Sequence, residues 1–182
     1  MDTTDDTGAG TGVAHVVLIG LMGSGKSAVG RLVAERLGRP FVDVDDVIVA
    51  QTGMTVRELW ERGGEVTYRP LERDVAVHTL AGDGPDVLGM PAGALDDELV
   101  QRALEAADTW TVWLRAEVPT LVKRVAGSDH RPLLGDDPHG VLTAHASARA
   151  ATYEAVADLV LDVEGRDPDE LAAAITGGRG GG

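Results

Sequence analysis

A glycine-rich segment near the start of the chain has the residue types and the spacing of a phosphate-binding loop. Residues 20–27 read Gly-Leu-Met-Gly-Ser-Gly-Lys-Ser, between an apolar run and a helical pattern, and match G-x-x-x-x-G-K-[ST]. Glycines at this spacing let successive backbone N–H groups converge on phosphate oxygens, and the N-terminus of the following helix adds positive potential. The lysine reaches the β- and γ-phosphates, and the serine can ligate Mg²⁺. The segment therefore predicts nucleotide binding through Gly23, Ser24, Gly25, Lys26, Ser27 and Ala28.

Two carboxylates are spaced to act beside this loop. Asp43 and Asp45 end the second apolar run, predicted as a strand over 41–44, and residues two apart on a strand point to the same side. One carboxylate can hold Mg²⁺, directly or through water, and the other can orient a substrate hydroxyl or accept its proton. A solvated acidic turn is the alternative, because the chain has 30 acidic residues.

Phosphate binding alone does not separate a kinase from a switch GTPase or a motor ATPase. A GTPase would need an Asn/Thr-Lys-x-Asp segment to read guanine, but the only other lysine, Lys123, is followed by Arg124 and Val125. A motor ATPase is usually larger than this chain. The size and the motif together favour a small-molecule kinase.

The composition limits the kinds of protein this can be. With 182 residues we expect one domain, at residues 13–176, between disordered Gly- and Asp-rich tails at 1–12 and 177–182. The formal net charge of −14 argues against nucleic acid or an anionic membrane surface as a partner, since both would repel the chain. The absence of cysteine excludes disulfides, thiolate metal sites and cysteine nucleophiles. Because no long apolar run or signal-peptide pattern is present, we expect a soluble, cytoplasmic protein.

Short apolar runs alternate with longer helical patterns along the chain. Strands are predicted at 15–20, 41–44, 87–90, 110–114 and 159–163, and helices at 26–37, 46–51, 56–61, 65–80, 96–106, 119–125, 141–156 and 168–175. This alternation predicts a three-layer α/β fold with a mainly parallel sheet. Pro70 should kink the fourth helix or mark its late start. The loop at 126–138, rich in Gly, Asp and Pro, has the composition of a mobile lid.

Several motifs in a fixed order resemble those of the shikimate kinases. Residues 20–38 and 41–45 look like the phosphate loop, first helix and Asp-x-Asp strand of that family. The resemblance continues through further matching segments, namely Thr52-Gly53-Met54-Thr55-Val56, Gly64-Glu65, Tyr68-Arg69-x-x-Glu72, Arg131-Pro132-Leu133-Leu134, Arg149 four residues before Tyr153, and Arg166-Asp167-Pro168. It covers nearly the whole chain between the tails.

The resemblance implies a fold, a reaction and its cofactors. The fold would be that of a P-loop kinase, with a five-stranded parallel sheet in the order 2-3-1-4-5 and a lid at about 126–138. The reaction would be the ATP-dependent phosphorylation of shikimate to shikimate 3-phosphate, in the pathway of aromatic amino-acid precursors. ATP and Mg²⁺ would be the cofactors, shikimate the small-molecule partner, and we expect a monomer.

The resemblance also implies a role for each site residue. In the nucleotide half, Lys26 would stabilise the transferring phosphoryl group, Ser27 and Asp43 would organise Mg²⁺, and the lid residue Arg131 would reach the phosphates; Arg124, Arg166 and Pro168 would border the adenine. In the acceptor half, Asp45 would act as base or positioner of the hydroxyl, Arg69 and Arg149 would clamp the substrate carboxylate, and Glu72 would hold Arg69.

Physical chemistry supports arginine in these places without the family. Arginine offers a planar two-pronged donor for a carboxylate that lysine cannot copy. An arginine in a lid can neutralise charge that develops on the transferring phosphoryl group. For Arg69 and Arg149 the alternative is a helical surface pair with Glu65, Asp74 or Glu154, which the spacing favours when the family is left aside.

The chain departs from the family pattern in the acceptor half. Shikimate kinases carry three consecutive glycines where this chain has Pro91-Ala92-Gly93, expected to form the floor of the acceptor site. Proline has no N–H to donate, and alanine disfavours positive φ. Tyr68 stands where the family usually has Phe and adds a hydroxyl near the site. Three readings stay open: a shikimate kinase that tolerates these changes, a paralogue acting on another polyhydroxylated acid or cyclitol, and a non-catalytic nucleotide-binding regulator.

Overall fold

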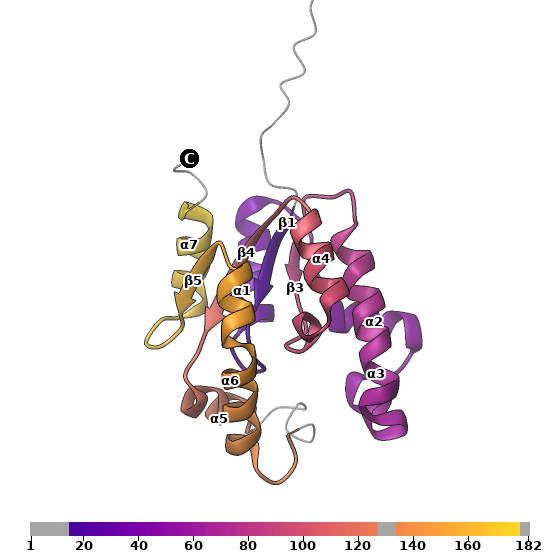
Figure 1. Ribbon diagram of the computed structural model, residues 1–182. Coiled ribbons are helices and arrows are strands. Elements are labelled where there is room, and N and C mark those ends of the chain that lie inside the picture. The colour runs from indigo at the N-terminus through magenta and orange to yellow at the C-terminus, as the bar shows by residue number, and fades with distance from the viewer. Residues whose placement is uncertain (1–14, 127–133, 179–182) are drawn as a thin grey trace, which may run out of the picture.

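The computed structural model describes residues 15–126 and 134–178. Its described residues form a central sheet covered by helices on both faces (Figure 1), which confirms the three-layer α/β prediction. The loops that leave the strands at the lower end of Figure 1 carry the residues of interest.

All five strands of the sheet are parallel, and the predicted order is confirmed. The strands are β1 (His15–Ile19), β2 (Phe41–Asp43), β3 (Val87–Gly89), β4 (Thr109–Arg115) and β5 (Leu159–Asp162). They lie in the order β2-β3-β1-β4-β5. Every residue of the central strand β1 is buried, which explains its continuous rather than alternating apolar run. Because parallel strands end at one edge, the segments after β1, β2 and β3 are neighbours.

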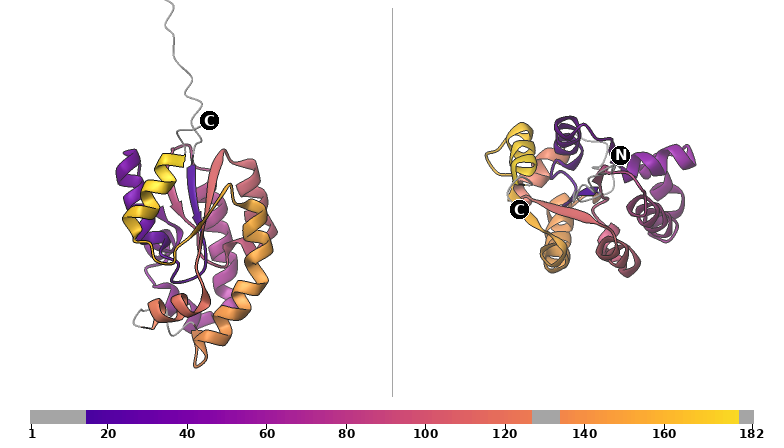
Figure 2. Two further views of the ribbon diagram at one scale, coloured as in Figure 1. Left: turned by 90° about the vertical axis from the view of Figure 1, so that its left-hand side faces the viewer. Right: turned by 90° about the horizontal axis from the view of Figure 1, so that it is seen from above.

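Helices from distant parts of the chain cover the two faces of the sheet. Figure 2 places α1 (Lys26–Leu37) and α7 (Pro168–Gly178) together on one face, and α4 (Glu98–Ala106) and α6 (Pro138–Val156) on the other. α5 (Val118–Val125) packs against α6. Side chains of β1 alternate between two buried clusters: Val16 and Leu18 join the cluster of α1 and α7, and Val17 and Ile19 join the other. Burial of both faces fixes the sheet between its helices.

The second strand ends earlier than predicted. β2 stops at Asp43, and α2 (Val44–Thr52) begins at the next residue. Asp43 is the N-cap of α2, because its Oδ1 accepts a hydrogen bond from the backbone N–H of Asp45 at 3.2 Å. The prediction that Asp43 and Asp45 share one strand is therefore wrong: a capping side chain turns the backbone into a helix before Asp45.

The long helix α3 (Val56–Leu80) is interrupted at a glycine. Thr55 and Glu58 form a capping box at its start. The break expected between 56–61 and 65–80 is present, because Gly64 has φ 61° and ψ −163°. Pro70 lies six residues beyond Gly64, and Gly64 is the one residue inside α3 with non-helical angles, so the helix neither kinks nor starts at Pro70 as predicted.

Some boundaries differ from the sequence-based ones. α6 begins at Pro138 with Asp137 as its N-cap, and α7 continues through Gly177 and Gly178, which we had assigned to the C-terminal tail. A short 3₁₀ helix, η1 (Ala94–Asp96), precedes α4. The tail 1–12 and most of the lid, including Arg131, lie outside the described residues. Among the residues that are described, no helix has the length and apolarity needed to span a membrane.

Candidate functional site

The phosphate loop joins β1 to α1 as the motif predicts. Gly23 and Gly25 have φ of 84° and 99°, in the left-handed region that favours glycine. A Cβ on Gly23 would lie 3.2 Å from the backbone oxygen of Leu121, so close packing against α5 also requires glycine there. Beside the loop is a cavity of about 240 Å³, lined by Met22, Gly23, Gly25, Lys26, Ser27, Ala28, Asp43, Asp45, Met90, Pro91 and Ala92.

Lys26 extends across this loop from the first turn of α1. Its Nζ donates to the backbone oxygens of Gly20 at 2.8 Å and Leu21 at 3.2 Å. Burial lowers the pKa of Lys26 to about 8, although Asp45 and Asp43 act in the opposite direction. The ammonium group of Lys26 therefore lies in the loop that is predicted to bind phosphate. Its charge changes within a pH range in which binding can be measured.

We expect nucleotide affinity to depend on the charge of Lys26. Below its pKa of about 8 the lysine already carries its proton; above it, ATP must bind together with proton uptake. The Kd of ATP should therefore rise about fivefold between pH 8 and pH 9, the change in protonated fraction for such a group. Calorimetric titration at several pH values measures this. Lys26→Met should bind ATP more weakly and without that slope; an equal slope in this variant would contradict the assignment.

Ser27 and Asp43 meet at the opposite side of the loop from α5. Ser27 Oγ donates to Asp43 Oδ2 at 2.7 Å, and both side chains line the cavity beside the loop. Within the described residues, no group of three or more His, Asp or Glu is arranged to hold a metal alone. One hydroxyl and one carboxylate suit Mg²⁺, which prefers oxygen ligands and takes the rest from phosphates and water. The donor set therefore fits a magnesium ion that binds with a nucleotide.

The residues expected around the adenine do not all lie together. Arg124 reaches over the loop, and its Nη1 donates to the backbone oxygens of Gly23 at 3.3 Å and Ser24 at 3.4 Å. Arg166 instead donates to the backbone oxygen of Glu170, at the start of α7. In the part of the chain that the structure describes, none of these three residues, Arg124, Arg166 and Pro168, lines the cavity beside the loop.

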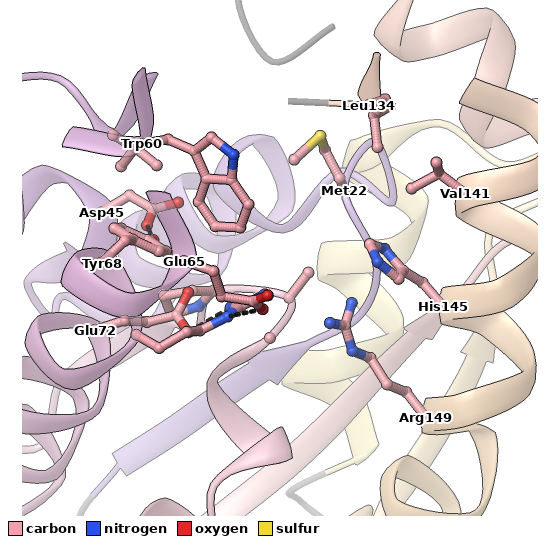
Figure 3. Close-up of a pocket in the computed structure, with 15 residues that line it drawn as sticks. Met22, Asp45, Trp60, Glu65, Tyr68, Glu72, Leu134, Val141, His145 and Arg149 are labelled. Carbon is pink, nitrogen blue, oxygen red and sulfur yellow. Dashed lines mark hydrogen bonds and ion pairs between the residues drawn. The ribbon is translucent and has the colours of Figure 1, made fainter. Parts of the chain in front are cut away.

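A second cavity, of about 210 Å³, opens next to the first (Figure 3). Its walls come from the phosphate loop, α2, α3, the segment after β3, and α6, and they carry most of the residues predicted to bind the acceptor. They are Met22, Asp45, Val56, Trp60, Glu65, Tyr68, Arg69, Glu72, Pro91, Ala92, Gly93, Leu134, Val141, His145 and Arg149. Asp45, Met22, Pro91 and Ala92 line both cavities, so the two spaces share a wall.

Asp45 enters this shared wall from the first turn of α2. Its Oδ1 accepts a hydrogen bond from the hydroxyl of Tyr68 at 3.0 Å, which joins α2 to α3. The hydroxyl of Tyr68 thus contacts the carboxylate that is expected to act as base or positioner.

Arg69 is held by two carboxylates of its own helix. Its Nη1 donates to Glu72 Oε2 at 2.7 Å, and its Nε donates to Glu65 Oε1 at 3.0 Å. The contact between Glu72 and Arg69 is therefore present, and so is the predicted pair with Glu65. Glu72 is 3 % exposed, and this burial raises its pKa, while Arg69 opposes the shift.

Arg149 projects from α6 toward the same cavity (Figure 3). Its Nε and Nη2 donate to both oxygens of Asp96 in η1, at 2.6 to 3.1 Å. The alternative partner Glu154 does not appear in any ion pair of the described residues, so that reading of Arg149 is wrong. Because Asp96 binds one edge of the Arg149 guanidinium, the orientation of the guanidinium plane is fixed.

The segment Pro91-Ala92-Gly93 forms the floor without backbone strain. No residue other than glycine has positive φ in the described ranges, and Gly93 itself has φ −99°. The hydroxyl of Tyr153 donates to the backbone oxygen of Ala92 at 2.6 Å and ties the segment to α6. A Cβ on Gly93 would overlap the guanidinium of Arg69. A side chain at position 93 would thus have to displace this guanidinium, and the backbone conformation tolerates alanine at 92.

Comparison with known proteins decides between the readings that the sequence left open. The sequence profile of the family "Shikimate kinase" matches residues 22–177. The chain is 42% identical over 164 residues to a shikimate kinase of Symbiobacterium thermophilum, which covers 88% of this chain and 93% of that one. The chain belongs to the shikimate kinase family. It is thus a small-molecule kinase of a family that uses ATP.

Further shikimate kinases support this membership. The one from Paramagnetospirillum magneticum is 40% identical over 164 residues, covering 90% of this chain and 83% of its own. The solved structure of the shikimate kinase from Acinetobacter baumannii in complex with shikimate superimposes with a TM-score of 0.85 at 30% identity, over 90% of this chain and 91% of that one. Family membership favours the first of the three readings over a paralogue or a regulator.

The sequence analysis did not identify all of the residues that line the acceptor cavity. His145 lines the cavity four positions before Arg149, one helical turn away, a spacing that could have indicated it. Burial lowers the pKa of His145, and Arg149 adds to this shift. Trp60 also lines the cavity. Asp96 had no sequence signal, since it meets Arg149 only through the fold.

We expect Gly93→Ala to weaken acceptor binding. The added methyl group would displace the guanidinium of Arg69 from its place against the backbone. The KM for shikimate should rise about tenfold, the loss of one charge-assisted hydrogen bond, with little change in the KM for ATP. Steady-state kinetics measure both constants. Gly177→Ala is the matched control, because a Cβ at that position meets nothing within 4 Å; equal effects of the two variants would contradict the close-approach argument.

Proposed function

We propose that this chain transfers the γ-phosphoryl group of ATP to a hydroxyl of shikimate, giving shikimate 3-phosphate and ADP. The observation that carries the proposal is the place of Asp45, which lines both the cavity beside the phosphate loop and the cavity with two arginines. A single carboxylate at a shared wall is positioned to act on a hydroxyl that faces a phosphate.

The acceptor cavity suits a hydroxylated carboxylic acid. Arg69 and Arg149 line it with their guanidinium groups held by Glu72 and Asp96. Guanidinium groups bind a carboxylate in a planar, two-pronged manner, and partners that hold them in place reduce the entropy lost on binding. The structure of the relative from Acinetobacter baumannii was solved in complex with shikimate, which carries this same chemical group. Arg69, Glu72, Ala92, Gly93 and Arg149 are the residues that we assign to the acceptor.

The reaction itself needs little covalent chemistry from the protein. The attacking hydroxyl and the leaving oxygen must be in line with the phosphorus, and the charge spread over the phosphoryl oxygens must be neutralised. Asp45 orients the hydroxyl and takes its proton as the new P–O bond forms. Lys26 stabilises the negative charge from the phosphate-loop side, and we assign Arg131, outside the described residues, to the same task from the lid.

We assign the magnesium site to Ser27 and Asp43. Ser27 Oγ and Asp43 Oδ2 are 2.7 Å apart and face the cavity beside the loop. When bound, the ion would be held by Ser27 and Asp43 and would neutralise part of the charge of the phosphates. Around the nucleotide we assign backbone contacts to Gly23, Ser24, Gly25 and Ala28, and contacts at the base to Arg124, Arg166 and Pro168.

Two further expectations concern the protein as a whole. The net charge of −14 supports a cytoplasmic enzyme that binds neither nucleic acid nor anionic membranes. We propose that it acts as a monomer.

The test of the proposed function is a coupled assay of ADP release with a panel of acceptors. With ATP and Mg²⁺, shikimate should give a kcat of about 1–100 s⁻¹, in the ordinary range of kinases. Polyols without a carboxylate should react far more slowly, because both arginines would lack their partner. Chelation of Mg²⁺ should stop the reaction.

Two outcomes would contradict the proposal in different ways. Activity on another polyhydroxylated acid or cyclitol, with none on shikimate, would establish the paralogue reading. ATP binding without turnover on any acceptor would make the chain a nucleotide-binding regulator.

A further inference from the structure

Tyr68 is a buried polar residue to which the mechanism above gives no task. Its side chain is 4 % exposed, on the second part of α3, and its hydroxyl donates to Asp45 Oδ1 at 3.0 Å. The ring is fixed from two sides: it meets Trp60 edge to face with centroids 5.7 Å apart, and the Arg69 guanidinium lies 5.9 Å from its centroid. A hydroxyl on a ring held in this way has little freedom to leave its acceptor.

The direction of this hydrogen bond follows from the surrounding charges. Burial raises the pKa of Tyr68 far above its ordinary value, and Asp45 and Glu72 raise it further. The hydroxyl therefore keeps its proton throughout the working pH range and can only donate it. The carboxylate of Glu72 also faces this hydroxyl, and the hydroxyl donates to Asp45 Oδ1 at 3.0 Å.

We infer that Tyr68 is a positioning residue for phosphoryl transfer, one that holds the carboxylate of Asp45 in its reactive orientation. This rests on the proposed function, in which Asp45 takes the proton of the acceptor hydroxyl. The backbone N–H of Asp45 is bound to Asp43, so Tyr68 fixes the side chain of a residue whose main chain is already fixed.

The hydrogen bond also links the two halves of the site. Asp45 lies beside Lys26 and Asp43 in the nucleotide half, and Tyr68 is adjacent in sequence to Arg69 in the acceptor half. The hydrogen bond from Tyr68 to Asp45 lies next to the ion pair between Arg69 and Glu72. Together these contacts fix the position of Asp45 relative to Arg69, which is assigned to the substrate carboxylate.

Tyr68→Phe tests the inference, because it removes the hydroxyl and keeps the ring. We expect kcat with shikimate to fall about tenfold, the effect of one hydrogen bond to a charged group. The KM for shikimate should change less than threefold, since the clamp is retained. A second Tyr68→Phe substitution made in Asp45→Asn should lower kcat no further, because the two residues act as a unit.

The matched control is Tyr153→Phe, which removes the hydroxyl from the other tyrosine of the chain. That hydroxyl donates to the backbone oxygen of Ala92 rather than to a carboxylate. The control should lose comparable thermal stability, and any effect that it has on kcat should be the same in the wild-type enzyme and in Asp45→Asn. Wild-type kcat in Tyr68→Phe, or a loss of kcat in Tyr68→Phe that is equally large when Asp45 is already Asn, would overturn the inference.

A second probe covers the case in which Tyr68→Phe does not fold. In the Tyr153→Phe background, 3-fluorotyrosine incorporated at position 68 reports on its hydrogen bond to Asp45 through the ¹⁹F chemical shift, and Asp45→Asn should move that shift. No movement would overturn the inference. Absence of shikimate turnover in the wild-type enzyme would instead contradict the proposed function itself, so the two failures are distinguishable.

Discussion

Asp45→Asn should lower kcat for phosphoryl transfer to shikimate by about 10²–10⁴, the contribution typical of a positioned general base. The amide keeps the size of the side chain and can still accept from Tyr68, but it takes no proton from the acceptor hydroxyl. ATP should bind with nearly unchanged Kd, because the phosphate loop and Lys26 are untouched. Stopped-flow or coupled ADP assays give kcat, and calorimetry gives the Kd.

Asp46→Asn is a close control for this substitution. Asp46 is the next residue of α2, exposed at 72 %, and its oxygen lies 3.6 Å from Arg31 on the surface. Such an exposed pair contributes little, so kcat should stay within about twofold of the wild-type value. If Asp45→Asn retained wild-type kcat, Asp45 would have no part in the chemistry, and the place of this residue between the two cavities would have another explanation.

Arg69→Ala should affect both acceptor binding and folding. Loss of a charged fork should raise the KM for shikimate about 10- to 100-fold, the value of a charge-assisted hydrogen bond or slightly more. The free energy of unfolding should fall by about 3 kcal/mol, because removing one partner leaves the buried carboxylate of Glu72 uncompensated. Kinetics and denaturant titration measure the two effects on the same preparation.

The loss of stability in Arg69→Ala should depend on pH. Burial raises the pKa of Glu72 above its value in the unfolded chain, and Arg69 opposes this shift. Without Arg69 the pKa rises further, so the folded state binds the proton more tightly than the unfolded state does. Stability linked to that proton is present below the unfolded pKa and is lost as the pH rises through the folded one. The variant should therefore be less destabilised at pH 5 than at pH 8.

Two further variants separate charge from geometry at this position. Arg69→Lys keeps a cation beside Glu72 but loses the planar fork, so it should recover more stability than acceptor affinity. Arg73→Ala removes the neighbouring arginine of α3, whose partner Asp74 is 67 % exposed, and should cost less than about 1 kcal/mol. Equal losses of stability in Arg69→Ala and Arg73→Ala would contradict the role of the buried carboxylate.

Local patterns were sufficient to predict the sheet and the phosphate loop. The buried central strand was visible as an unbroken apolar run, and the loop was visible because glycines, a lysine and a serine recur at a spacing that phosphate binding requires. The sheet order came from the resemblance to shikimate kinases, since no rule of local sequence sets the order of five strands. The pair of Arg69 and Glu65 was accessible too, because residues four apart share one face of a helix.

What could not be predicted depends on contacts between distant segments. Asp45 was placed on a strand, but the side chain of Asp43 caps a helix at that point and turns the chain. The partner of Arg149 is Asp96, on another element, and composition gives no sign of such a pair. The strain expected at Ala92 is absent, because the segment after β3 turns without positive φ. In each case, packing set a side-chain contact or a backbone angle that differs from the one indicated by the local sequence pattern.

The most direct test of the account is a ³¹P NMR spectrum of shikimate, ATP and Mg²⁺ incubated with the wild-type protein. We predict one new phosphate monoester that grows in equal amount with ADP, with a proton–phosphorus coupling to the ring hydrogen at carbon 3 of shikimate. ADP accompanied by inorganic phosphate, with no phosphate monoester, would contradict the account, because the site would then hydrolyse the nucleotide rather than transfer its phosphoryl group.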